Sequence, residues 1–277
     1  MRLPVNGHDT YCYTGGRSFD PTLPTAVLIH GVLNDHSVWA MQSRWLANHG
    51  WNVLAVDLPG HCRSAGAAPQ SVEEAADFII ALLDALGVER AALVGHSWGS
   101  LIALEAASRM KARATHLALV GTAWPMKVSP ALLDAALNAP ETALRMVNVY
   151  SRSTLCAPPS ALGPGTWVFG AQMALGRRVL ASNPEVNVFH RGFMACDQYA
   201  GGEAAIVNVE CPVLFVLGAQ DQMTTPKAAQ ILVAAAKQAG KTVTVRMLPV
   251  GHNEMTEAPE ETLAALRDFL VDRHDRI

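Results

Sequence analysis

The segment Gly95-His96-Ser97-Trp98-Gly99 has the residue types and spacing of a nucleophilic turn. It follows a short apolar run at residues 91–94 and opens a stretch of helical periodicity at residues 97–110. In a G-x-S-x-G turn between a strand and a helix, the glycines permit a sharp bend that exposes the serine hydroxyl. We therefore predict that Ser97 is a nucleophile, with an ordinary helix N-cap as the alternative.

A serine hydroxyl needs a base that removes its proton and an acid that orients this base. Asp221 follows the apolar run at residues 212–217, and His252 follows the run at residues 242–248. The carboxyl ends of parallel strands meet at one edge of a sheet, so both side chains are expected beside Ser97. Taken singly, Asp221 could be a turn residue and His252 a solvated loop residue.

The reaction also needs N–H donors for the negative charge that develops on the substrate oxygen. The main-chain N–H of Trp98, directly after the serine, is one predicted donor. The second is predicted to be the N–H of Val32, in the loop after the run at residues 25–29, with Leu33 as the alternative. His30 ends the early strand and has no local acid, so a structural role is expected for it.

Short apolar runs alternate with longer amphipathic stretches, which is typical of an α/β fold with a mostly parallel twisted sheet covered by helices. The N-terminus, around residues 11–14, is expected to add an antiparallel hairpin. Strands are predicted at residues 25–29, 51–56, 91–94, 116–120, 212–217 and 242–248, and helices at residues 71–86, 97–110, 226–239 and 257–271.

No clear strand lies between about residue 120 and residue 212, and a structureless loop of that length is implausible in a compact domain. Helices are predicted there at residues 129–138, 141–151 and 166–180. Residues 124–205 are thus expected to form a helical lid, and residues 1–123 and 206–277 the core. An apolar substrate pocket is predicted from Leu33, Trp124, Trp167, Met173 and Met194, with Met126, Phe169 and Phe193 as further candidates. Packing between the lid helices is the competing interpretation, which helical spacing favours.

Together these motifs resemble those of the lidded α/β-hydrolase superfamily, in its serine esterase-like branch, over nearly the whole chain. The loop Asp57-Leu-Pro-Gly-His-Cys-Arg-Ser64 is similar to the D-x-P-G-H-G-x-S loop of that family, with Cys62 at a position where Gly is usual. His30-Gly31 resembles the oxyanion-loop His-Gly of the family, and Gly251-His252 resembles its catalytic Gly-His.

The resemblance implies a catalytic triad of Ser97, Asp221 and His252, with an oxyanion hole at Val32 and Trp98. It implies a cofactor-free serine hydrolase, most simply a carboxylesterase acting on small to medium apolar acyl esters through an acyl-enzyme. Dehalogenases and epoxide hydrolases of this fold use an aspartate nucleophile where this chain has serine. A carbon–carbon bond hydrolase, an acyltransferase and a small-molecule receptor on a hydrolase scaffold remain as alternatives, because substrate choice depends on lid geometry.

The composition narrows the remaining classes of function. Of 277 residues, 50% are hydrophobic and 16% are charged, which favours a large buried core over disorder. The formal net charge is −3 and no basic cluster is present, so no nucleic-acid partner is expected. Five scattered cysteines, no metal-ligand spacing, no long apolar run and no apolar leader segment predict a cytoplasmic protein with no metal, no cofactor and no membrane span. The expected partner is a small ester-like substrate, and the pattern does not indicate an oligomeric state.

Overall fold

A computed structural model describes residues 1–161 and 163–271. Residue 162, in the predicted lid, and residues 272–277, in the predicted core, lie outside the described residues. Within these ranges, every helix is too short or too polar to cross a membrane.

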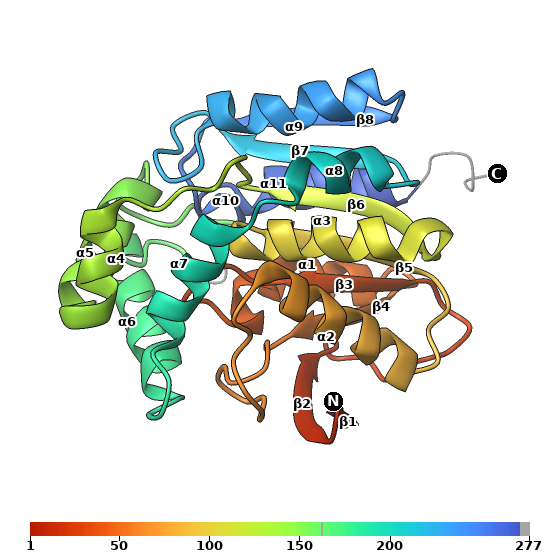
Figure 1. The fold of residues 1–277 in the computed structure, drawn as a ribbon, viewed down its shortest axis with the longest axis horizontal. Coiled ribbons are helices and arrows are strands. Elements are labelled where there is room, and N and C mark those ends of the chain that lie inside the picture. Colours follow the sequence, from red (N-terminus) through yellow and green to blue (C-terminus); the bar gives the residue numbers. More distant parts are fainter. Residues whose placement is uncertain (162, 272–277) are drawn as a thin grey trace.

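An eight-stranded sheet forms the centre of the protein, and it confirms the predicted α/β class (Figure 1). The strand order is β1-β2-β4-β3-β5-β6-β7-β8. The first two strands make antiparallel pairs, whereas β3 to β8 are parallel. The strands are β1 (Arg2–Val5), β2 (His8–Tyr13), β3 (Thr25–Ile29), β4 (Asn52–Val56), β5 (Ala91–His96), β6 (Ala114–Val120), β7 (Val213–Gly218) and β8 (Val243–Leu248).

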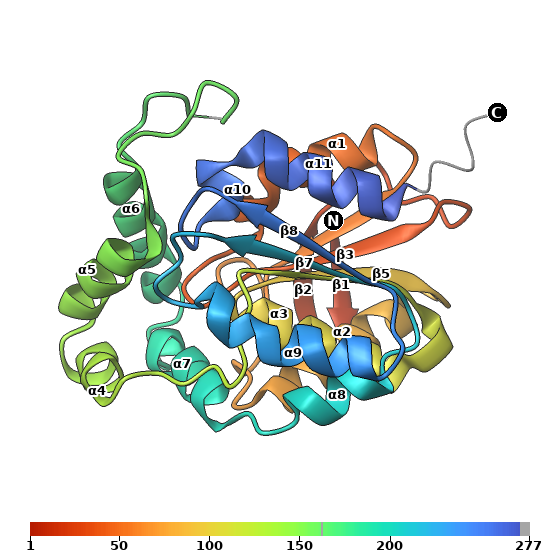
Figure 2. The same ribbon diagram turned by 90° about the horizontal axis from the view of Figure 1, so that it is seen from above.

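Helices cover both faces of the sheet (Figure 2). Val27 and Ile29 of β3 pack in the cluster beneath one set of helices, whereas Ala26 and Leu28 pack in the cluster beneath the other. This two-sided burial explains why the central strands are apolar throughout. One face carries α1 (Ala40–Ala47) and α11 (Pro259–Leu270); the other carries α2 (Val72–Ala85), α3 (Trp98–Met110), α8 (Gly202–Asn208) and α9 (Pro226–Gln238). Short helical turns complete the connections: η1 (His36–Trp39), η2 (Lys111–Arg113) and α10 (Glu254–Glu257).

Four further helices lie between β6 and β7 in the chain and stand together at one end of the sheet, on the left of Figure 1. They share an apolar cluster that includes Leu132, Leu144, Met173 and Phe189. They fall within the predicted lid range and are called the lid helices below: α4 (Pro130–Asn138), α5 (Pro140–Ser151), α6 (Val168–Ala181) and α7 (Val188–Gln198). The sequence analysis did not single out α7. The predicted lid range, 124–205, ends inside α8, which instead contacts α3 and α9.

Polar contacts join the end of α6 to two loops of the core, the loop that carries Asp35 and the loop that carries Cys62. Arg178 pairs with Asp35 at 2.6 Å, and the Ser182 hydroxyl accepts a hydrogen bond from the main-chain N–H of Cys62 at 2.9 Å. Asn183 Nδ2 donates to the Gly60 carbonyl at 3.1 Å. The side of the lid formed by α6 is therefore tied directly to the core.

Candidate active site

Ser97 lies at the sharp turn between β5 and α3, with φ of 53° and ψ of −120°. This is a strained backbone conformation for a residue with a side chain. A Cβ atom at Gly95 would lie 2.0 Å from the Gly99 carbonyl oxygen, and one at Gly99 would lie 2.4 Å from the Ile29 oxygen. Both glycines of the motif are therefore required by close backbone contacts, which hold the serine at the carboxyl end of the sheet.

Asp221 and His252 approach each other from the loops after β7 and β8. The distance from His252 Nδ1 to Asp221 Oδ2 is 2.8 Å, and both side chains are buried. The other oxygen, Oδ1, accepts the main-chain N–H of Met223 at 2.7 Å and that of Thr224 at 2.9 Å. Asp221 therefore both orders its own turn and contacts the histidine ring.

The Thr224 hydroxyl is a further member of this group. Its Oγ1 lies 2.7 Å from Asp221 Oδ2 and 2.9 Å from His252 Nδ1. Burial alone would raise the pKa of Asp221, but the charge of His252 and the hydrogen bonds from His252 and Thr224 outweigh burial and lower it. The carboxyl is therefore ionised and can orient a protonated His252 Nδ1. The sequence reasoning missed Thr224, although its position three residues after an aspartate is typical of a turn.

A buried pair, His96 and Glu254, lies behind the histidine loop. His96 Nε2 lies 2.8 Å from the His252 carbonyl oxygen, and 3.6 Å from Glu254 Oε2. Burial raises the pKa of the Glu254 carboxyl well above its usual value, and the negative charge of Asp221 adds to the effect. A carboxyl group with a raised pKa therefore lies near Asp221, whose pKa is lowered. The sequence reasoning did not predict this group.

The predicted oxyanion loop runs directly past Ser97. A Cβ atom at Gly31 would lie 3.1 Å from the Ser97 Cβ, so this loop and the nucleophilic turn are in contact. The Asn34 N–H donates to the Gly31 carbonyl at 3.2 Å, and Leu33 has a φ of 55°. This turn places Val32 and Leu33 in the wall of a cavity beside Ser97.

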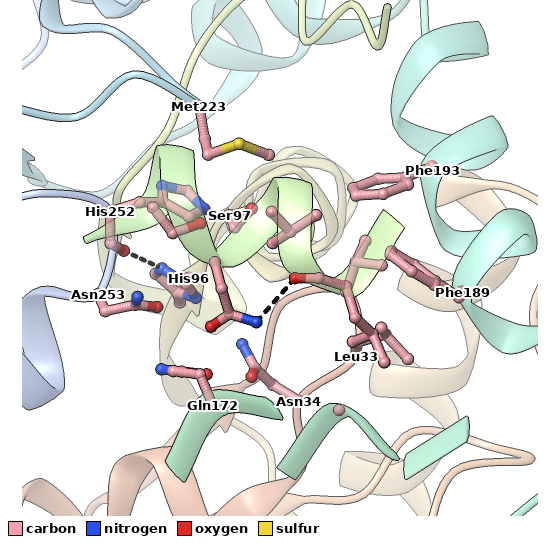
Figure 3. A pocket seen from close by; sticks show the side chains of 16 residues that line it. Leu33, Asn34, His96, Ser97, Gln172, Phe189, Phe193, Met223, His252 and Asn253 are labelled. Atoms are coloured by element: carbon pink, nitrogen blue, oxygen red, sulfur yellow. Dashed lines mark hydrogen bonds between the residues drawn. The ribbon is translucent and has the colours of Figure 1, made fainter. Parts of the chain in front are cut away.

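Two cavities meet at Ser97. The smaller, of about 50 Å³, is also lined by His252 and has a mixed polar and apolar wall (Figure 3). Its lining residues are Val32, Leu33, Asn34, His96, Ser97, Leu144, Val147, Asn148, Ser151, Gln172, Gly176, Phe189, Phe193, Met223, His252 and Asn253. The larger, of about 270 Å³, is mainly apolar and is lined by Ser97, Met126, Lys127, Val128, Ser129, Leu132, Met146, Tyr150, Phe193, Cys196, Gln222, Met223 and Thr224.

The predicted pocket residues divide between these cavities and other places. Leu33 lines the smaller cavity, and the further candidates Phe193 and Met126 line one or both. Neither lining includes the other four of the first set. Trp124 packs edge-on against Tyr199, with the ring centres 5.4 Å apart, and Trp167 is 61% exposed and stacks on Phe169. Met173 is buried and its sulfur contacts Asn148. Met194 lines a separate surface depression.

One group of possible metal ligands occurs among the described residues. Asp35, His36 and Asp57 each offer one possible ligand atom, and these three atoms lie within 4.8 Å of one another. His36 Nδ1 is 2.7 Å from Asp57 Oδ1, and Asp35 already pairs with Arg178. These groups satisfy one another and lie outside both cavities at Ser97, so we assign them to loop structure.

Comparisons with known proteins show the family to which this chain belongs. The sequence profile of the Alpha/beta hydrolase family matches residues 26–266. The chain is 26% identical over 254 residues to (E)-2-((N-methylformamido)methylene)succinate hydrolase of Acinetobacter baylyi, which covers 88% of this chain and 89% of that protein. It is 37% identical over 98 residues to the dihydrolipoyllysine-residue acetyltransferase component of the acetoin cleaving system of Pseudomonas putida, covering 35% of this chain and 26% of that one. The chain thus spans about a quarter of the length of several curated relatives.

Solved structures show the same fold at low sequence identity. The esterase of Exiguobacterium antarcticum superimposes with a TM-score of 0.80 at 16% identity, over 97% of this chain and 98% of that one. The enol-lactonase of Burkholderia xenovorans superimposes with a TM-score of 0.78 at 22% identity, over 98% of this chain and 99% of that one.

Proposed function

The chain belongs to the alpha/beta hydrolase family, and on that premise we propose that it is a cofactor-free serine hydrolase that cleaves carboxylic esters of small to medium apolar acids. The observation that carries this proposal is the 2.8 Å contact between Asp221 and His252, with His252 and the strained Ser97 in the wall of one cavity. An activated serine requires a base that an acid orients, and the contact between Asp221 and His252 supports this assignment.

In the proposed reaction, Ser97 Oγ attacks the ester carbonyl while His252 Nε2 accepts the hydroxyl proton. Asp221 holds Nδ1–H and stabilises the imidazolium that forms. His252 then returns the proton to the leaving alcohol, which leaves an acyl-enzyme. Water, activated by the same nitrogen, attacks the acyl group, and the acid is released as Ser97 recovers its proton.

The main-chain N–H groups of Val32 and Trp98 are the proposed donors to the oxyanion. The close contact between Gly31 and Ser97 supports this assignment, because it brings the loop after β3 alongside the start of α3. Donors fixed in the backbone need no reorganisation when charge develops. In comparable enzymes each donor lowers the activation barrier by about 3 kcal/mol.

We further propose that the lid helices control substrate choice. Residues of α5, α6 and α7 line the smaller cavity, and residues of α4, α5 and α7 line the larger one. The core supplies the reacting groups, whereas the lid supplies most of the remaining wall.

Steady-state hydrolysis of p-nitrophenyl esters of increasing acyl length tests this function. The wild type is expected to turn over short and medium esters, and Ser97→Ala to lose about 10³-fold or more of kcat/KM. Ser18→Ala is a matched control, because Ser18 is exposed and lines neither cavity at Ser97. Equal activity of the wild type and Ser97→Ala would overturn the nucleophile assignment.

An inactive wild type would overturn the ester proposal and shift attention to the alternatives that share the triad. Carbon–carbon bond cleavage would then be detected as release of an acid from ketone substrates. Acyl transfer would be detected as formation of a new ester or thioester only when an alcohol or thiol acceptor is added. Binding of a small molecule with little turnover would indicate a receptor.

A further inference from the structure

The smaller cavity contains an unusual group of neutral polar side chains. Four carboxamides line it, from four separate segments: Asn34 in the loop after β3, Asn148 on α5, Gln172 on α6 and Asn253 directly after His252. In Figure 3 the amides of Asn34, Gln172 and Asn253 lie on one side of the cavity, and the rings of Phe189 and Phe193 lie on the other.

Several of these polar groups are buried without a partner. Asn253 is 7% exposed, and its Nδ2 has no hydrogen-bond partner within residues 1–161 and 163–271. The same holds for the hydroxyl of Ser151, which also lines this cavity. Asn34 is buried and Gln172 is half-buried, and neither side-chain amide makes a hydrogen bond to the described part of the chain. Buried polar groups are normally satisfied, so these donors and acceptors are available to a ligand.

Asn148 shows that the group includes an acceptor as well as donors. Its Nδ2 is already used, because it donates to the Leu144 carbonyl at 2.8 Å and contacts Met173 Sδ at 3.3 Å. Its carbonyl oxygen is left for the cavity. Asn253 Nδ2 and Asn148 Oδ1 therefore offer opposite partners to one bound group.

Charge and size restrict what can bind. Within the described residues, no Lys, Arg, Asp or Glu side chain lines this cavity, so it offers no counter-ion for a carboxylate or an ammonium group. A volume of about 50 Å³ holds roughly four water-sized units. The larger apolar cavity, on the other side of Ser97, has room for a bulkier group.

We propose that the smaller cavity binds a compact, uncharged amide carried by the substrate a few bonds from the scissile ester, while the larger cavity binds its apolar part. An amide supplies one N–H donor and one carbonyl acceptor, which complement the Asn148 oxygen and the Asn253 nitrogen. This inference rests on the proposed ester hydrolysis, and it specifies the substrate class.

Two pairs of isosteric esters test the proposal, one for each side of the ester bond. Ethyl N-acetylglycinate is compared with ethyl 4-methylpentanoate, and 2-acetamidoethyl butyrate with 4-methylpentyl butyrate, by acid release. In the pair whose amide lies on the correct side of the ester bond, kcat/KM for the amide ester is expected to exceed that for the alkyl ester by about tenfold or more. The alkyl group would leave buried polar atoms of the cavity unpaired. Monoethyl glutarate, a carboxylate on the acyl side, is expected to be poorer than the amide.

Asn253→Leu, which is near-isosteric, and Gln172→Leu, which is one heavy atom smaller, each remove one carboxamide. Both are expected to lower the amide-to-alkyl ratio several-fold. Asn138→Leu, at an exposed position on α4, is the matched control and is expected to keep the ratio. Asn253→Leu changes the residue next to His252 and could lower the rate by displacing that ring. Gln172 lies on α6, away from His252 in the chain, so Gln172→Leu tests substrate recognition without that effect. A preference for the alkyl ester in both pairs, or a ratio unchanged by both variants, would overturn the proposal.

Failure of the proposed function is distinguished by binding to the Ser97→Ala protein. Calorimetric titration of this variant with each ester measures recognition without turnover. Tighter binding of an amide ester than of its alkyl isostere, weakened by Gln172→Leu, supports the amide site even if the wild type hydrolyses no ester. Equal or weaker binding of both amides overturns the amide site, whatever the activity.

Discussion

His96 Nε2 lies 2.8 Å from the main-chain oxygen of His252, 156 positions further along the chain. A carbonyl oxygen only accepts hydrogen bonds, so Nε2 of His96 must carry the proton. Burial, followed by the proximity of His252, lowers the pKa of His96 to about 3, so its ring stays neutral around neutral pH. The residue before the nucleophile thereby fixes the loop that presents the base.

Replacing His96 tests this relationship. We expect His96→Phe to lower kcat by about tenfold with little change in KM, because losing a buried hydrogen bond costs about 1–2 kcal/mol and frees the histidine loop. His96→Gln can still donate and is expected to recover part of the rate. Steady-state kinetics on one p-nitrophenyl ester checks both variants. Equal rates for the two would show that the donor does not matter.

Thr224 is expected to position Asp221 and His252 through its hydroxyl. We predict that Thr224→Val lowers kcat about tenfold, because the buried carboxylate loses a hydrogen bond, whereas Thr224→Ser stays near wild type. Asp221→Asn is expected to cost about 10⁴-fold, because the amide no longer favours the required histidine tautomer. Rates measured across a pH series separate the variants. If Thr224→Ser falls as far as Thr224→Val, the hydroxyl alone does not account for the role of Thr224.

Glu254 should make stability depend on pH. Its folded-state pKa is raised above the ordinary value of 4.5, so between these two values the folded protein binds more protons than the unfolded chain. The free energy of unfolding therefore decreases as pH rises through that window. Glu254→Gln removes this loss, and we expect the variant to gain stability relative to wild type as the pH rises above 4.5.

Denaturant unfolding at several pH values measures this difference. Glu260→Gln, at an exposed position of α11, is the control and is expected to track the wild type. If the stability difference between Glu254→Gln and wild type does not change with pH, the carboxyl does not titrate as described.

Cys62 occupies a left-handed backbone conformation, with a φ of 46°. That conformation costs a residue with a side chain about 1–2 kcal/mol, and glycine adopts it freely. We predict that Cys62→Gly raises the free energy of unfolding by about 1 kcal/mol, since the main-chain bond to Ser182 is retained. Thermal and urea unfolding measure this change, with the exposed Cys156→Gly as a comparison. A destabilised Cys62→Gly would mean that the thiol contact with Asp35 is worth more than the strain.

The thiol of Cys62 should also be unreactive. Burial, with the charges of Asp35 and Asp57, raises its pKa to about 12, so little thiolate forms at neutral pH. Cys156 is exposed, and we expect it to react first with a maleimide reagent. Mass spectrometry of labelled peptides checks the order. Labelling of Cys62 before Cys156 would contradict it.

The fold class was predictable from the sequence, as was the placement of Ser97, Asp221 and His252 at the carboxyl ends of strands, for reasons that can be stated. Ser97 lies in a turn whose two glycines are required by backbone contacts, so the motif itself carries the geometry. Asp221 follows the buried, continuously apolar strand β7, and His252 follows β8, a half-buried edge strand whose β-branched residues are visible in the sequence. Such strands place the residues after them at a shared edge, and the predicted fold class was confirmed on the same basis.

The cavity walls were much harder to predict. Trp124, Trp167 and Met194 are large and apolar, but residue type does not reveal which side of a lid helix faces Ser97. That depends on how the lid helices pack on one another and on the core. The carboxamides gave no periodic pattern, because each comes from a different segment. The helix α7 was detectable from a local feature, since the side chain of Asn187 caps it by accepting the His190 N–H at 3.0 Å.

The strands that flank the lid are neighbours, with Val120 of β6 opposite Val216 of β7 and the Gly121 N–H donating to the Val216 carbonyl at 2.9 Å. The chain therefore leaves the sheet at the carboxyl end of β6 and, after α8, re-enters it at the start of the neighbouring parallel strand β7. An insertion attached in this way can change its length and helix arrangement while the sheet keeps its register. One insertion or replacement between the end of β6 and the start of β7 would exchange a whole substrate-binding surface and leave the loops after β5, β7 and β8 unchanged. Chimaeras joined at these two positions are therefore the direct way to transfer specificity between relatives.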